Sequence, residues 1–141
     1  MATRRKTAVG KYCDIEEWLQ VPCVITSGKD NEVGAVRSLR NGAVIEILVA
    51  KTALSYTYTQ PVREGRQYNL YHGTVEAVPV NATTSKLVYT LIFDNSMLAD
   101  DAARDKDIQQ RTGQFTRALN NMKILAEGGT LPPSASRGPA R

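Results

Sequence analysis

The sequence contains few of the residues that metal sites and common catalytic centres use. Its 141 residues include one histidine and two cysteines. Cys13 and Cys23 do not have the spacing of zinc ligands, and only His72 could join them. We therefore expect two buried, small apolar cysteines in a reduced compartment. No nucleophile elbow, Walker loop or dinucleotide fingerprint is present, so no metal or other cofactor is predicted.

Long apolar runs are also missing. No segment reaches the roughly 18 apolar residues of a membrane span, and the first residues, MATRRKTAVGKY, lack the apolar centre of a secretory signal. We therefore expect a cytoplasmic protein. Basic residues near the two ends contribute much of the net charge of +4, which indicates solvated tails rather than a nucleic-acid-binding surface.

The chain has the length of one domain that buries a core without disulfides. We expect a basic, flexible leader over residues 1–11 and a single domain over residues 12–127. Residues 128–141, GGTLPPSASRGPAR, are rich in glycine, proline and serine, which predicts a disordered tail.

What the sequence does contain is a series of strand patterns followed by one helix pattern. A short helix, IEEWL, begins after the cap residue Asp14. The Asn41-Gly42 pair is typical of a hairpin turn. Alternation of apolar residues predicts a short strand at PCVIT, and longer ones at Ala35–Leu39, Ala43–Lys51, Leu54–Gln60, Tyr68–Val80 and Ser85–Asp94.

A long amphipathic helix pattern runs from about Ala99 to Glu127. Gly113 in its interior predicts close packing or a bend. Its apolar stripe consists of Ile108, Phe115, Leu119, Met122 and Leu125. This order of elements predicts an α+β helix-grip fold, in which a curved antiparallel sheet wraps around a long C-terminal helix and leaves a cavity between them. We expect function in that cavity.

Strand alternation places large side chains on matching faces of successive strands. They are either ordinary core residues or core residues whose tips also face a ligand. His72 points to the opposite face. The residues on these matching faces are Tyr56, Tyr58, Tyr71, Tyr89, Leu91 and Phe93.

Glu46 is a carboxylate among aliphatic residues, and Arg37 lies on the neighbouring hairpin strand. The two form either a surface ion pair or a buried pair at the polar end of a pocket. On the helix, Gln110, Gln114 and Ala118 form a ladder. Glutamines in such a ladder either orient a ligand or face solvent.

The segments YCDIEEW, GAVRSL, VIEIL, SYTY, YNLYHGTVEAV, LVYTLIFDN and FTRALNNMKIL, in this order, resemble the START-like (SRPBCC) superfamily, in particular its polyketide cyclase/dehydrase and lipid-transport branch. The resemblance covers roughly Tyr12 to Glu127. It implies a cavity for a small hydrophobic or aromatic ligand and raises the expectation that Arg37 and Glu46 face inward. The lining positions it implies are Arg37, Glu46, Tyr58, Tyr71, Tyr89, Leu91, Phe93, Gln114 and Ala118.

The sequence departs from that family in two ways. No strand pattern precedes the first helix. Either the first strand is missing, which leaves an exposed sheet edge that favours a homodimer, or this sequence begins downstream of the true start. The lysine that anchors a carboxylate in hormone receptors of this fold has no counterpart near Val21.

Three functions remain open. The first is a non-enzymatic carrier or sensor of a lipid- or polyketide-like molecule. The second is a cyclase, aromatase or dehydratase in which Arg37, Glu46 and the tyrosines assist proton transfer. The third is a structural subunit that assembles through its sheet edge.

Overall fold

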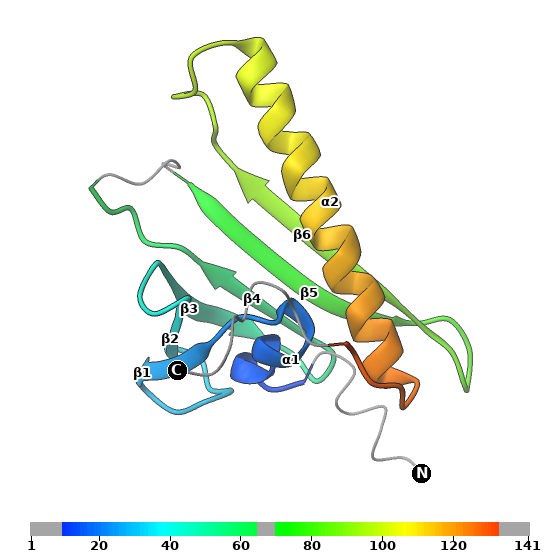
Figure 1. Ribbon diagram of the computed structural model, residues 1–141. Coiled ribbons are helices and arrows are strands. Elements are labelled where there is room, and N and C mark those ends of the chain that lie inside the picture. Colours follow the sequence, from blue (N-terminus) through cyan, green and yellow to red (C-terminus); the bar gives the residue numbers. More distant parts are fainter. Residues whose placement is uncertain (1–9, 65–69, 133–141) are drawn as a thin grey trace.

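The computed structural model describes residues 10–64 and 70–132. Within them, a six-stranded antiparallel sheet is followed by one long helix (Figure 1), which confirms the predicted α+β order. The expected leader and tail lie mostly outside the described residues. The elements are η2 (Tyr12–Asp14), α1 (Ile15–Leu19), β1 (Cys23–Ser27), β2 (Val36–Leu39), β3 (Val44–Lys51), β4 (Ser55–Thr59), β5 (Tyr71–Pro79), β6 (Ser85–Phe93) and α2 (Asp101–Ala126).

The sheet is a simple meander in which each strand pairs with the next one in the chain. The turn between β2 and β3 uses left-handed backbone conformations at Arg40, Asn41 and Gly42, with φ angles of 52°, 57° and 92°. Asn and Gly adopt such angles readily, which explains why this pair marks the hairpin. The turn sets a register in which Arg37 lies directly opposite Glu46.

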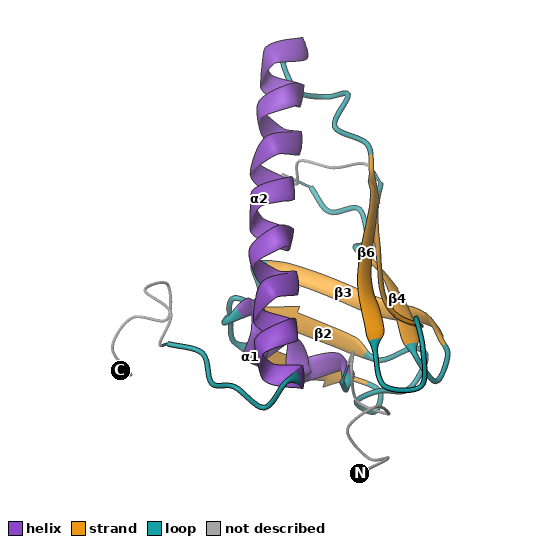
Figure 2. Ribbon diagram, turned by 90° about the vertical axis from the view of Figure 1, so that its right-hand side faces the viewer, coloured by secondary structure: helices purple, strands orange, loops and turns teal. Residues whose placement is uncertain are grey.

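Two irregularities interrupt the sheet. The register shifts between Ile25 and Ser27 where β1 meets β2, and between Leu48 and Ala50 where β3 meets β4. Such bulges bend strands and increase their twist. Figures 1 and 2 show the result, a curved sheet with α2 along one face.

Helix α2 is anchored at its C-terminal half. Phe115, Ala118 and Met122 are buried there, and the amide of Asn121 donates a hydrogen bond of 2.9 Å to the carbonyl of Trp18 at the end of α1. The prediction that the apolar stripe packs against the sheet was therefore partly right. Ile108, however, is 49% exposed, because it lies beside an open space between α2 and β6.

Gly113 also differs from expectation. A Cβ atom placed there would meet only the guanidinium of Arg117, at 3.5 Å, so no tight packing requires the glycine.

The expectation of unpaired cysteines was wrong, because Cys13 and Cys23 form a disulfide. Their Cα atoms are 5.6 Å apart, within the usual range for this bond. Sequence spacing could not reveal this, because η2 and α1 fold back and carry Cys13 to the start of β1. The carboxylate of Glu16 accepts a bond of 3.2 Å from the backbone N–H of Cys23 at the same junction.

Candidate ligand-binding cavity

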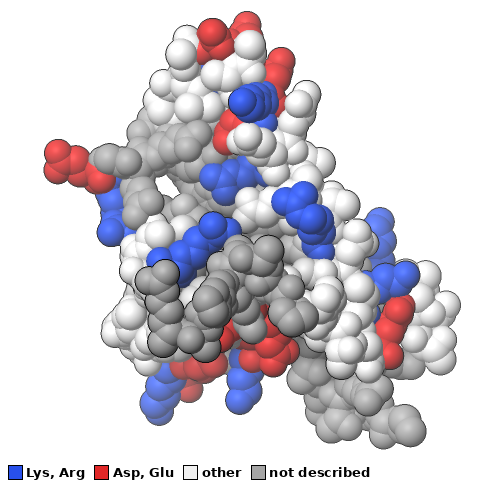
Figure 3. All heavy atoms as spheres, viewed as in Figure 1, with Lys and Arg blue, Asp and Glu red and all other residues white. Residues whose placement is uncertain are grey.

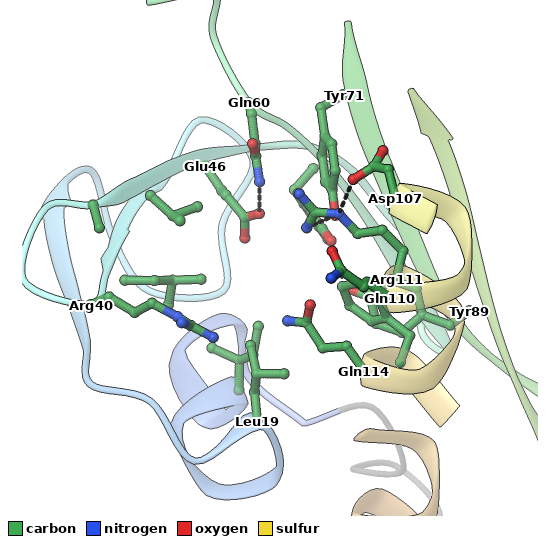
Figure 4. A pocket seen from close by; sticks show the side chains of 16 residues that line it. Leu19, Arg40, Glu46, Gln60, Tyr71, Tyr89, Asp107, Gln110, Arg111 and Gln114 are labelled. Carbon is green, nitrogen blue, oxygen red and sulfur yellow. Dashed lines mark hydrogen bonds and ion pairs between the residues drawn. The ribbon is translucent and has the colours of Figure 1, made fainter. Parts of the chain in front are cut away.

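A cavity of about 450 Å³ lies between the inner face of the sheet, α1 and α2 (Figure 4). This volume is in the usual range of small-molecule sites. Its apolar walls come from three directions: Ile15 and Leu19 from α1, Leu39 and Val44 from the β2–β3 hairpin, and Phe115 from α2. Polar and aromatic side chains complete the lining.

Arg37 and Glu46 form a buried ion pair at one side of this cavity. The guanidinium donates to Oε1 of Glu46 through Nε at 2.9 Å and Nη2 at 2.6 Å. Arg37 is 0% exposed and Glu46 3%. Of the two arrangements that the sequence left open, the structure contains the buried pair.

The surroundings hold both partners in place. Nη1 of Arg37 donates to the carbonyl of Tyr12 and to the hydroxyl of Tyr56, and the guanidinium carbon lies 3.9 Å from the centre of the Tyr12 ring. Burial alone would lower the pKa of Arg37, but the adjacent Glu46 carboxylate and the surrounding tyrosines together outweigh it and the pKa is raised. Arg37 therefore stays charged.

Only Glu46 of this pair lines the cavity; Arg37 lies behind it. Oε2 of Glu46 accepts a hydrogen bond of 2.8 Å from the amide of Gln60. Both carboxylate oxygens are thus engaged, one by Arg37 and the other by Gln60. The carboxylate is a fixed polar group of the wall rather than an unpartnered base.

Tyr58 and Tyr89 meet across the sheet, with their hydroxyl oxygens 2.6 Å apart. Burial raises the pKa of both phenols well above the ordinary value, so both are protonated at neutral pH. Gly73 makes this contact possible: it lies opposite Tyr58 in the register, and a Cβ atom there would overlap the Tyr58 ring. The requirement for glycine was not recognised in the sequence, where Gly73 looks like an ordinary strand residue.

Helix α2 contributes a polar row that sequence reasoning identified only in part. Gln110 and Gln114 both line the cavity. Asp107 and Arg111 were not predicted, although their separation of four residues is that of a helical ion pair. Their closest charged atoms are 4.0 Å apart, and Arg111 also donates to the hydroxyl of Tyr71 at 3.5 Å.

Arg40 was predicted only as part of the hairpin turn, yet it lines the cavity. In Figure 4 its guanidinium extends toward the side chains of α2. The turn residues in the sequence do not indicate that Arg40 lines a cavity, because the direction of its side chain depends on how the hairpin packs.

The structure brings together half of the predicted site residues. Of the ten predicted residues, Tyr89, Leu91 and Phe93 border a second space of about 330 Å³ between β6 and α2, and Tyr89 borders both spaces. Arg37, Tyr56 and Ala118 are buried and border neither space. The predicted residues that line the main cavity are Glu46, Tyr58, Tyr71, Tyr89 and Gln114.

No protein-family model matches this chain, and no curated protein is significantly similar to it. Among the described residues, no helix has the length and apolar character needed to cross a membrane. Within residues 10–64 and 70–132, no three His, Cys, Asp or Glu side chains gather as metal ligands would.

Proposed function

We propose that the protein is a START-like, helix-grip carrier or sensor that binds a small molecule with an aromatic or apolar body in the cavity between the sheet and α2. The observation that carries this is the mixed lining of the cavity. The Tyr58, Tyr89 and Phe115 rings offer large apolar surfaces. Fixed polar groups, such as Glu46, are available to orient a ligand.

The state of Glu46 favours binding over catalysis. A general base must be free to accept a proton from the substrate, whereas Arg37 and Gln60 occupy both oxygens of Glu46.

The alternative is a cyclase, aromatase or dehydratase with the same cavity. One observation favours it: the protonated Tyr58–Tyr89 pair could donate a hydrogen bond to an enolate that forms on a bound substrate. Turnover of a polyketide-like substrate that is lost in Tyr58→Phe, with the fold intact, would support this alternative.

Binding of the uncharged, environment-sensitive dye Nile red tests the proposal. The double variant Tyr58→Ala with Tyr89→Ala should bind the dye at least tenfold more weakly. A control is His72→Ala with Thr90→Ala, which changes two residues of the neighbouring strand β5 and of β6 itself that are outside the cavity lining. Unchanged dye affinity in a cooperatively folded tyrosine variant would refute the proposal.

Assembly through the sheet edge is a further candidate function. Strand β6 pairs only with β5 among the described residues. The backbone N–H of Asp94 donates to the carbonyl of Leu70 on the β5 side. The backbone N–H and C=O groups of even-numbered β6 residues therefore point toward β5, and those of odd-numbered residues point toward the open edge. Antiparallel pairing of two β6 strands about Thr90 would place Lys86 opposite Asp94 of a second copy and Val88 opposite its Ile92, both favourable pairs.

Native mass spectrometry and amide hydrogen exchange test this homodimer. A dimer protects the odd-numbered amides of β6 in a concentration-dependent manner. Lys86→Glu should weaken it and Asp94→Lys in the same chain should restore it. A monomer at all concentrations would exclude the dimer, and concentration-independent protection would show that another part of the chain covers the edge.

A cytoplasmic location remains a prediction. Disulfides persist mainly in oxidising compartments, so the Cys13–Cys23 bond weighs against it. Thiol alkylation of the protein in intact cells, followed by mass spectrometry, distinguishes free cysteines from disulfide-bonded ones. Labelled cysteines indicate a reduced cytoplasmic protein, and protected cysteines indicate an oxidising compartment.

A further inference from the structure

The charges around the cavity do not cancel. Arg37 is paired with Glu46 at 2.6 Å. Arg111 is near Asp107 at 4.0 Å. Arg40 has no carboxylate within ion-pair distance among the described residues, and its guanidinium makes no hydrogen bond there. Among the described residues that line the cavity or pair with its lining, one positive charge is therefore unmatched, and it is on Arg40.

The backbone of Arg40 is held in place by two hydrogen bonds. Its N–H donates to the carbonyl of Pro22 at 3.1 Å, and its own carbonyl accepts from Ala43 at 3.3 Å. Its φ angle of 52° is unfavourable for a residue with a long side chain. A residue held in such a conformation at a cavity is a candidate for a functional role.

Hydrogen-bond donors lie across the cavity from Arg40. Figure 4 shows the Gln114 side chain pointing toward Arg40, with Gln110 and Arg111 beside it on α2. An anion between them would accept bonds from the guanidinium and from an amide at once. Figure 3 shows the face seen in Figure 1, where Lys and Arg side chains lie across the middle and acidic ones lie toward the edges; a basic centre favours approach of an anion.

We infer that the cavity binds a monocarboxylate whose acid group is held by Arg40 and Gln114 and whose apolar body lies against the rings of Tyr89 and Phe115. The planar guanidinium matches the geometry of a carboxylate. A doubly charged phosphate fits less well, because the described residues offer one unmatched positive charge and the Glu46 and Asp107 carboxylates line the same cavity. This inference rests on the proposed ligand-binding function.

Three matched probes test it by displacement of Nile red: 2-naphthoate, 2-naphthamide and 2-naphthyl phosphate. Wild-type protein should bind the naphthoate at least tenfold more tightly than the amide, because bonds to a charged group are stronger, and more tightly than the phosphate. Arg40→Met should remove the preference for the acid and leave affinity for the amide unchanged. Arg117→Met, an exposed residue of α2 outside the cavity lining, removes the same charge and should keep the preference.

The outcomes separate the two proposals. Equal affinity for acid and amide, or a preference that survives Arg40→Met, would overturn the carboxylate assignment while cavity binding stands. Tighter binding of the phosphate would assign a doubly charged anion instead. If the dye binds but none of the probes displaces it or binds directly in calorimetry, this inference fails while cavity binding stands. If Nile red itself does not bind and the probes do not bind either, the proposed function and this inference both fail.

Discussion

Replacement of Glu46 by glutamine should destabilise the fold more than any surface substitution. The change keeps the shape of the side chain but removes its charge, which leaves Arg37 as a buried cation without a carboxylate. The side chains of the two residues are 0% and 4% exposed, so water cannot solvate the charge. Loss of one partner of a buried pair costs about 3–5 kcal/mol of unfolding free energy.

A double-mutant cycle gives the coupling between the two residues. Arg37→Met should cost a similar amount, because it leaves the Glu46 carboxylate buried. The double variant Arg37→Met with Glu46→Met removes both charges and should recover much of the loss. The single changes would then be strongly non-additive, with a coupling of several kcal/mol.

Urea melts followed by the fluorescence of the single tryptophan provide the assay. Trp18 is 4% exposed and contacts the Tyr89 ring, so its emission reports loss of the packing around the cavity. Lys123 and Glu127 form a matched exposed pair, with side chains 69% and 66% exposed, and their coupling should stay below about 1 kcal/mol. A coupling below about 0.5 kcal/mol for Arg37 and Glu46 would show that the two residues do not form a buried ion pair.

Other predictions concern backbone freedom, the disulfide and pH. Gly73→Ala should destabilise the protein by about 1–3 kcal/mol, because it displaces the Tyr58 ring, whereas Gly113→Ala should stabilise it by about 1 kcal/mol; denaturant melts that rank them the other way would contradict both. Reduction of the disulfide should lower the unfolding free energy by about 2–3 kcal/mol, and an unchanged melt in reductant would show that the bond contributes little. Burial raises the pKa of four tyrosines, so the folded state keeps their protons at a pH where the unfolded state releases them. The unfolding free energy should therefore fall as pH rises above about 10. Absorbance of tyrosinate near 295 nm should rise together with loss of helical circular dichroism, and tyrosinate that forms in the folded protein would contradict this; the four are Tyr12, Tyr56, Tyr58 and Tyr89.

The order and approximate bounds of the strands could be predicted because alternation, turn residues and helix periodicity are local properties. Strand alternation also grouped Tyr58 with other aromatic residues on one face, whereas it left open whether Glu46 faces inward. What could not be predicted depends on contacts between distant segments. The Cys13–Cys23 bond requires the fold-back of α1, and the path of Arg40 into the cavity requires the packing of the hairpin against α2.

The unpredicted role of Gly73 has the same cause. Its lack of a side chain matters only because Tyr58 lies across it in the register. The family resemblance directed attention to Arg37, yet the structure shows Glu46 between that arginine and the cavity. A resemblance of motifs assigns a face of a strand, and it does not say which member of an ion pair touches a ligand.

Native mass spectrometry of the protein purified from its source shows whether the cavity holds a ligand. We predict a bound small organic acid, present on the wild-type protein and lost from the Tyr58→Ala, Tyr89→Ala double variant. The His72→Ala, Thr90→Ala control should retain it. A ligand that stays bound to the folded tyrosine variant would contradict the claim that this cavity is the binding site.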